Sequence, residues 1–217
     1  MTLKLYAHPF SSYCQKALIA LWENDTAFEY RSLDDPQAGA ELAALWPLRR
    51  FPVLVDAGRT VVEATVIIEH LQRFHGGPRP MIPDDPLAAL DVRTLDRIFD
   101  NYVMTPMQAV VANALRPADQ RDPYGVAKAC EMLEASYAWL DRTLGGRQWA
   151  CGDVFGLADC AAAPSLFYAD WVYEIAPQYA RLRGYRQRLL ARPSVARAVD
   201  EARPFRSYFP LPVPDRD

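Results

Sequence analysis

The segment His8-Pro9-Phe10-Ser11-Ser12-Tyr13-Cys14-Gln15-Lys16 groups the residue types best suited to chemistry in this sequence. It follows a short apolar segment that predicts a strand, and it opens a run whose apolar spacing predicts a helix. A serine at a helix start can cap free backbone N–H groups. The helix dipole is positive there, so the same position favours an anion such as a thiolate. The residues alone leave both roles open for Ser11 and Ser12.

Two later segments could act with this helix start. Phe51-Pro52 begins a predicted strand, and because X-Pro bonds are cis in only about 5–6% of cases, the residues alone predict a trans bond. Glu63-Ala64-Thr65 lies where a strand passes into a helix. The N–H groups of Ala64 and Thr65 could hold a carboxylate there, and Glu63 could meet an ammonium group. The alternative for Glu63 is that it only caps the helix.

The elements that must position these segments form an α/β pattern. Strands are predicted at residues 3–6, 27–33, 51–56 and 60–63, and helices after residue 11, at residues 38–45 and after residue 65. The order is β-α-β-α-β-β-α over residues 1–77. Residues 78–86 contain four prolines, Pro78, Pro80, Pro83 and Pro86, which predict a semi-rigid linker and a domain boundary.

Residues 87–217 are predicted to be all helical. Helices are expected at residues 87–115, 123–144, from about 157, at 177–191 and at 194–202. Pro106 is expected to kink the first of them. An alanine-rich run after residue 157 is expected to form a central helix, because small side chains let neighbouring helices approach. The tail after residue 204 carries Phe205, Tyr208 and Phe209.

Composition excludes several classes of protein. The 217 residues have a formal net charge of −3, without the basic surface of a nucleic-acid binder. No run of about 18 apolar residues would span a membrane, and no targeting signal is apparent. The four cysteines are widely spaced, which favours reduced thiols in the cytoplasm. The three histidines show no ligand spacing with the cysteines, so no metal site is expected.

Four segments together resemble cytosolic glutathione S-transferases, and the helix start is similar to that of the serine-type zeta and tau classes and bacterial members. They are residues 11–21, 51–54, 63–71 and 152–159. Each motif is weak alone, but their order across both parts of the chain is specific. The resemblance implies a thioredoxin-like domain at residues 1–77, followed after the linker by an all-helical domain at 87–217.

The resemblance also implies roles for residues. Ser11, five residues before Lys16, matches the catalytic serine that stabilises the thiolate of glutathione, the co-substrate. The residues matched to glutathione binding are Arg50, Phe51, Pro52, Glu63, Ala64 and Thr65. In the family the bond before this proline is cis. Asp159 matches a buried acid that caps the central helix and acts in folding.

The sequence departs from the family pattern at Ala64, Gly156 and Arg49. Ala64 lacks the usual serine hydroxyl, which costs about 1.5–3 kcal/mol in binding unless Thr65 replaces it. Gly156 stands where a capping serine or threonine is usual, and Arg49 where many members have glycine. The segment also overlays the Cys-Pro-Tyr-Cys of glutaredoxins, but only Cys14 remains. It is expected to be a buried helix residue, not half of a redox pair.

The energies allow Ser11 to act without being a base. A thiol with a pKa of about 8.5 is only a few per cent ionised at neutral pH. Lowering that pKa by about two units requires about 2.7 kcal/mol. A hydroxyl donating to a charge contributes about 1.5–3 kcal/mol, and a helix N-terminus about 0.3–1. Ser12 and His8 are the alternatives for the contact with sulfur.

The second substrate is expected to be a hydrophobic electrophile bound between the domains. The side chains expected to contact it are Phe10, Tyr13, Tyr102, Met104 and Met107. The tail aromatics could close over it. The reaction could be conjugation, isomerisation, dehalogenation or peroxide reduction, although Tyr13 replaces the cysteine of the zeta motif. The resemblance implies a homodimer. The alternatives are a non-catalytic binding or regulatory protein with this fold and a dithiol reductase.

Overall fold

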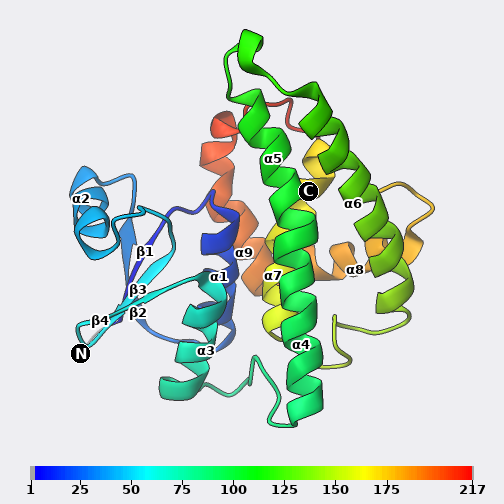
Figure 1. Cartoon of the computed structure of the whole chain (residues 1–217). Coiled ribbons are helices and arrows are strands. Elements are labelled where there is room, and N and C mark those ends of the chain that lie inside the picture. Colours follow the sequence, from blue (N-terminus) through cyan, green and yellow to red (C-terminus); the bar gives the residue numbers. More distant parts are fainter. Residues whose placement is uncertain (1–2, 217) are drawn as a thin grey trace.

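The first part of the chain is built on a mixed β-sheet (Figure 1). We analysed a computed structural model that describes residues 3–216. In this range the sheet has the strand order β2-β1-β3-β4. β1 (Leu3–Ala7) pairs in parallel with β2 (Phe28–Ser32) and antiparallel with β3 (Val53–Asp56), which forms a hairpin with β4 (Arg59–Val62).

Three helices cover the two faces of this sheet. α1 (Ser12–Glu23) and α3 (Ala64–Phe74) share one face, on which Leu54 packs with Ile67 and other buried side chains. α2 (Pro36–Leu45) lies on the other face, where its Leu42 packs with Val53. Alternation along β3 thus sends successive side chains to opposite layers. The predicted thioredoxin-like α/β domain is confirmed.

The second part of the chain is helical, as predicted. Its helices are α4 (Pro86–Ile98), α5 (Thr105–Ala114), α6 (Pro123–Leu144), α7 (Leu157–Val172), α8 (Ala180–Leu190) and α9 (Pro193–Ala202). Short 3₁₀ turns follow α5 and α9, at Ala118–Gln120 and Arg203–Tyr208. In the part of the chain that the structure describes, no helix is long and apolar enough to cross a membrane.

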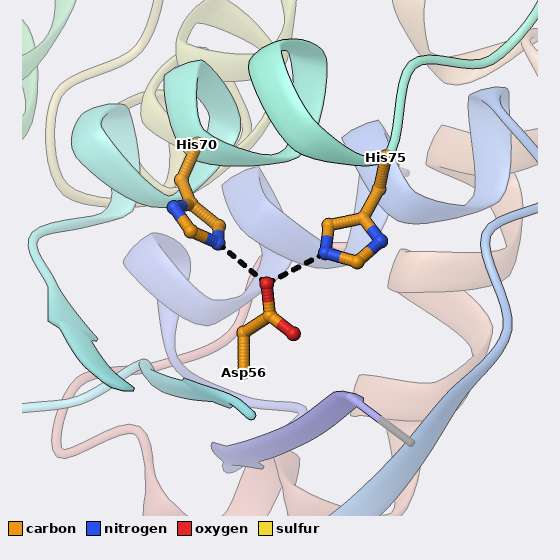
Figure 2. Close-up of side chains that lie close together, drawn as sticks. All are labelled: Asp56, His70 and His75. Carbon is orange, nitrogen blue, oxygen red and sulfur yellow. Dashed lines mark hydrogen bonds and ion pairs between the residues drawn. The ribbon is translucent and has the colours of Figure 1, made fainter. Parts of the chain in front are cut away.

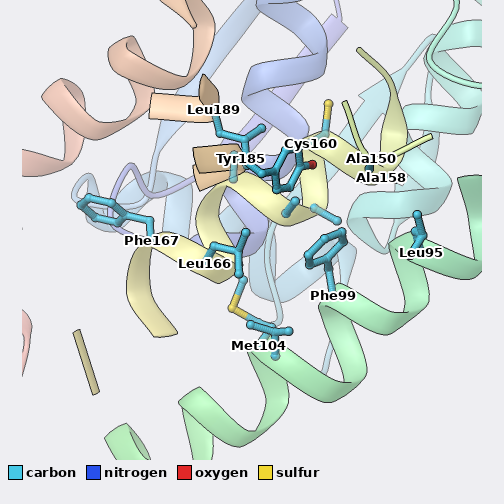
Figure 3. Close-up of a cluster of buried hydrophobic side chains, with 14 of the residues drawn as sticks. Leu95, Phe99, Met104, Ala150, Ala158, Cys160, Leu166, Phe167, Tyr185 and Leu189 are labelled. Atoms are coloured by element: carbon cyan, nitrogen blue, oxygen red, sulfur yellow. The ribbon is translucent and has the colours of Figure 1, made fainter. Parts of the chain in front are cut away.

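α7 is the central helix of this domain, and all but the last of its residues are buried. Figure 3 shows Leu166 and Phe167 of α7 within a cluster that also includes Phe99, Met104 and Tyr185 from other segments. α7 also packs directly on α1, which joins the two domains. The alanines between the large side chains let these helices approach closely, as the sequence predicted.

The helix predicted at residues 87–115 is interrupted by a π-helical segment, Phe99–Met104, between α4 and α5. The expectation of one α-helix kinked at Pro106 is therefore corrected. Pro106 has no N–H for the carbonyl of Tyr102, and the Ser136 hydroxyl donates to that carbonyl at 2.9 Å.

Asp159 caps α7 from within the core. Its carboxylate accepts hydrogen bonds from the N–H groups of Gly156 and Ala150 and from the Tyr185 hydroxyl. Burial is the main cause of the raised pKa of Asp159. A side chain at Gly156 would place its Cβ 2.7 Å from the Met81 carbonyl oxygen. The close approach of the linker backbone thus explains the glycine at this capping position.

Glu23, at the end of α1, joins three parts of the chain through its buried carboxylate. It accepts hydrogen bonds from Arg192 and Ser194 near the start of α9 and from Arg79 in the linker. Burial raises the pKa of Glu23, but these hydrogen bonds outweigh it, so the net pKa lies below the ordinary 4.5. The ionised carboxylate therefore stabilises the folded state.

We predict that Glu23→Gln lowers the free energy of unfolding by about 3 kcal/mol at pH 7, because it removes one partner from buried charges. The contribution of Glu23 is fully present above pH 4.5 and is lost as the pH falls through its lower folded pKa. Urea denaturation at pH 7 and at pH 4 measures this. Glu131→Gln, in an exposed pair with Lys128, is the control and should cost less than about 1 kcal/mol. An equal loss in both variants would contradict the prediction.

Candidate functional site

A cleft of about 520 Å³ lies between the thioredoxin-like domain and the α4–α5 region. Its lining mixes both signs of charge with aromatic groups. The lining residues are Ser11, Tyr13, Trp46, Arg49, Arg50, Phe51, Pro52, Val62, Glu63, Ala64, Arg97, Asp100, Asn101 and Gln108. The three separate segments singled out in the sequence thus meet at one cleft.

Ser11 is the N-cap of α1 and faces the cleft. Its hydroxyl oxygen accepts from the N–H of Cys14 at 3.4 Å, a long hydrogen bond that leaves the hydroxyl proton available to another acceptor. Capping and anion binding, the two alternatives that the sequence left open, are therefore compatible at this residue. The positive end of α1 points toward the same place.

The neighbours of Ser11 are less suited to contact a ligand. His8 Nδ1 accepts from the Phe10 N–H at 3.1 Å, so Nε2 carries the proton, and it lies 3.2 Å from Asp34 Oδ1. Ser12 is buried within α1. Cys14 is fully buried, as predicted, and burial raises the pKa of its thiol to about 12. Cys14 is therefore a neutral thiol at physiological pH.

The peptide bond between Phe51 and Pro52 is cis. The trans bond predicted from the residues alone is therefore wrong, and the cis bond implied by the family resemblance is confirmed. Phe51 is partly exposed on the cleft, beside the exposed Arg50. Arg49 has φ 52°, in the left-handed region that glycine adopts without steric cost. This conformation accounts for the glycine that is usual at this position.

Glu63 joins β4 to α3 and has φ 69°, a strained value for a residue with a side chain. Although it occupies the N-cap position, its side chain makes no capping hydrogen bond within the described residues, so the capping alternative is not supported. The exposed carboxylate lines the cleft. Ala64 and Thr65 follow. The first hydrogen bond of α3 runs from the Ile67 N–H to the Glu63 carbonyl, so the N–H groups of Ala64 and Thr65 lie ahead of the helix's own hydrogen bonds.

Thr65 directs its hydroxyl away from the cleft lining, into a buried network. Lys16 Nζ donates to Thr65 Oγ1 at 2.8 Å, and Thr65 donates to Asp96 Oδ2 at 3.0 Å. Arg97 also donates to this hydroxyl. The threonine side chain therefore does not replace the hydroxyl missing at Ala64, and the backbone N–H is what Thr65 can offer a ligand.

Lys16 is the centre of this network and is only 1% exposed. Its ammonium lies 2.5 Å from Asp96 Oδ1 and 2.7 Å from Asp100 Oδ2. Arg97 pairs with both carboxylates from the solvent side. Burial is the main cause of the raised pKa of Asp100, which the Lys16 charge opposes. The network ties α1 and α3 to the end of α4 and to the π-helical segment that follows it.

Tyr13 lines the cleft two residues beyond Ser11. Burial, followed by the nearby Asp100 charge, raises the pKa of its phenol to about 12. Tyr13 is therefore protonated at neutral pH and can donate a hydrogen bond into the cleft.

The other residues expected to contact a second substrate lie elsewhere in the described structure. Met104 and Met107 are buried in the core of the helical domain. Tyr102 is half exposed on a separate apolar hollow with Trp139 and Ser136. Phe10 packs edge-on against the ring of Tyr168. Tyr102 and Met104 lie within the π-helical segment, and Met107 lies in the first turn of α5.

The α4–α5 side of the cleft is instead lined by four polar residues that sequence analysis did not single out: Arg97, Asp100, Asn101 and Gln108. The pair Asp96 and Asp100, four residues apart, was the available signal, because two acids at this spacing repel one another on a helix face unless a cation lies between them. The tail aromatics Phe205 and Tyr208 contact the ring of His8, behind the Ser11 loop.

Known proteins share this fold. The N-terminal domain of glutathione S-transferases matches residues 5–79, and their C-terminal domain matches residues 108–188. A solved glutathione S-transferase from Methylobacterium radiotolerans, in complex with glutathione sulfonate, superposes with a TM-score of 0.80 and 29% identity, covering 92% of this chain and 95% of the other.

Two curated relatives have different names. A Nicotiana tabacum protein named "Probable glutathione S-transferase" is 29% identical over 74% of this chain and 68% of its own length. A stringent starvation protein A homolog from Coxiella burnetii is 26% identical over 76% of this chain and 75% of its own length. The two domain matches, which together cover most of the chain, show that it belongs to the glutathione S-transferase family.

We predict that Lys16→Met lowers the free energy of unfolding by about 3–5 kcal/mol, because Asp96 and Asp100 lose their buried cation. Denaturation in urea, followed by tryptophan fluorescence, measures the loss. Lys4→Met is the matched control, since Lys4 pairs with Glu29 at an exposed site and should cost less than about 1 kcal/mol. A Lys16 variant as stable as the Lys4 variant would show that the network contributes no net stability.

Proposed function

We propose that this protein is a glutathione transferase in which Ser11 stabilises the thiolate of bound glutathione for attack on an electrophilic small molecule. The observation that carries the proposal is the convergence of Ser11, Phe51 and Glu63 on one cleft. The bound glutathione sulfonate of the Methylobacterium radiotolerans relative supports a tripeptide ligand of this kind.

The charges of the cleft complement those of glutathione. Glu63 is placed to meet the ammonium of the γ-glutamyl group, and the first N–H groups of α3 its carboxylate. Arg50, with Arg49 beside it, faces the cleft where the glycine carboxylate would be held. The backbone of Phe51 would pair with the cysteinyl residue between them. In this arrangement the thiol lies toward Ser11.

Ser11 is preferred to its neighbours as the sulfur contact. Both ring nitrogens of His8 are engaged by Phe10 and Asp34, and Ser12 is buried. The proton that leaves the thiol passes to solvent, and the Ser11 hydroxyl donates to the sulfur that remains. The serine and the helix dipole together supply about the 2.7 kcal/mol that a shift of two pKa units requires.

The second substrate is proposed to enter from the α4–α5 side of the cleft. Tyr13 offers a protonated hydroxyl there, and the electrophile would also meet Asn101 and Gln108. A substrate with both an apolar body and a hydrogen-bonding group suits this lining.

We also propose a cytoplasmic homodimer, for which the partly exposed Tyr102, Met132 and Trp139 offer apolar surface.

A non-catalytic ligand-binding role is the second candidate, favoured by the missing hydroxyl at Ala64. The relative named as a stringent starvation protein A homolog is consistent with a family that includes other roles. Calorimetry separates the two, because an enzyme must bind glutathione, and no heat at millimolar glutathione would rule out the transferase. A dithiol reductase is not supported, since Cys14 is fully buried.

We predict that Ser11→Ala binds glutathione nearly as well as the native protein but loses about tenfold to a hundredfold in turnover at neutral pH. The thiol then ionises near its ordinary pKa, so the pH–rate profile should move to higher pH. The measurements are calorimetry with glutathione and the pH dependence of conjugation to a chromogenic electrophile.

Ser11→Thr is the control for this experiment, because it retains the hydroxyl and the cap. It should keep much of the activity. An unchanged rate and pH profile in Ser11→Ala would remove Ser11 from the mechanism.

We predict that Ala64→Ser tightens glutathione binding by about tenfold or more, since it restores a hydroxyl at the helix start that faces the γ-glutamyl carboxylate. Calorimetry with glutathione measures the change. Val66→Ser, which adds a hydroxyl to an exposed position of the same helix, is the matched control and should leave affinity unchanged. Equal affinity in all three proteins would show that no carboxylate is held at Ala64.

A further inference from the structure

A second cluster of chemically active side chains lies on the thioredoxin-like domain, away from the cleft residues. His70 and His75 come from α3 and the residue after it, and Asp56 ends β3. Figure 2 shows both imidazole rings pointing at the same carboxylate. His70 Nε2 lies 2.8 Å and His75 Nε2 2.7 Å from Asp56 Oδ2. Among residues 3–216 this is the one group of three whose ligand atoms converge within 4.8 Å.

The local fold explains why these three side chains meet. Ala57 and Gly58 both have positive φ, as a two-residue turn between β3 and β4 requires, and this turn fixes Asp56 at the strand end. Asp56 shares a sheet face with Leu54, which packs against α3. His70 lies in the last two turns of α3, and His75 caps its end by donating its N–H to the Leu71 carbonyl.

The donor set suits a particular class of metal ion. Two imidazoles with one carboxylate favour Zn²⁺ and related divalent transition ions over Mg²⁺ or Ca²⁺, which prefer oxygen ligands. The His75 side chain is 30% exposed, which leaves a route for an ion and for water ligands.

Binding an ion would require the three side chains to move, because each imidazole nitrogen now lies within hydrogen-bond distance of Asp56 Oδ2. Zn²⁺ lies about 2.0–2.1 Å from nitrogen ligands, so tetrahedral ligand atoms are roughly 3.3 Å apart. Each nitrogen must therefore move about half an ångström away from the oxygen. Each imidazole would also transfer its Nε2 proton to Nδ1 through solvent, which changes neither its charge nor the number of bound protons.

We propose that Asp56, His70 and His75 bind a Zn²⁺-type divalent ion with three protein ligands, closing the β3–β4 hairpin onto the end of α3. The site is independent of the proposed transferase reaction. The expectation from the sequence that no metal would bind considered only the spacing of histidines and cysteines, and did not include a carboxylate from the hairpin.

The test is metal binding by the full-length protein after chelator treatment and desalting. Exposed thiols could bind metal elsewhere, so Cys130→Ser/Cys151→Ser serves as the background, since these two cysteines are partly exposed. Titration with Zn²⁺ in a calorimeter should give one ion per chain. Titration with Co²⁺ should give visible bands of a four- or five-coordinate ion without a thiolate charge-transfer band.

Three variants separate a metal site from a purely hydrogen-bonded cluster. His75→Gln keeps a donor for Asp56 but removes a ligand, and should weaken Zn²⁺ binding by about a hundredfold or more, as should His70→Gln. His8→Gln, at the remaining histidine, should leave binding unchanged. Zn²⁺ should also raise the melting temperature of the background protein but not that of His75→Gln.

Two results would overturn the proposal. One is the absence of stoichiometric binding in the background protein. The other is equal binding in His75→Gln and His8→Gln. Neither result bears on glutathione turnover, because none of these variants changes a residue of the cleft.

Discussion

The buried ammonium of Lys16 is the constraint on which the arrangement of this protein depends. A cation that is 1% exposed is tolerated only when anions and hydrogen-bond acceptors surround it. Asp96 and Asp100 supply the anions from the α4 region, and Thr65 supplies an acceptor from α3. Separation of the two domains would break the contacts of Lys16 with Asp96 and Asp100. The network therefore fixes their relative orientation more precisely than apolar packing alone, which has no directional requirement.

This network also explains the spacing between Ser11 and Lys16. The two residues are a little more than one helical turn apart on α1, so anchoring Lys16 in the domain interface fixes the helix start that presents Ser11. Thr65, in the first turn of α3, is held by the same ammonium. The ends of two helices are thus positioned against one cleft before any ligand binds. Such preorganisation is what a site needs if hydrogen bonds and helix dipoles are to stabilise a charge.

Much of the architecture could be predicted from the sequence. The strands of the hairpin, the bounds of α6 and the buried, alanine-rich α7 follow from local patterns of side chains. The three segments of the cleft were also identified from the sequence, because each lies at the start of a helix or strand. Ser11 precedes α1, Phe51-Pro52 precedes β3, and Glu63 precedes α3. The cis bond at Phe51-Pro52 could not be predicted from residues alone, since tertiary contacts select the isomer.

The π-helical segment could not be predicted from the sequence for a different reason, because a π-helical turn leaves no simple signal in the apolar pattern. The Asp56, His70 and His75 cluster was missed because the β3–β4 turn, β4 and the first half of α3 separate Asp56 from the two histidines in the sequence. A pattern along the sequence does not show which polar side chains from distant segments lie close together in the fold.

The α4–α5 side of the cleft has a polar lining. Met104 and Met107 turn into the core, while Asn101 and Gln108 line the cleft opposite Ser11. Since Thr65 is already bound to Lys16 and Ala64 has no hydroxyl, the γ-glutamyl end of a ligand would depend on backbone N–H groups and on Glu63. Backbone groups at a helix start bind a carboxylate through fixed geometry, which the strained backbone of Glu63 helps to set. The interface network therefore determines not only how the domains meet but also which groups are left to hold a substrate.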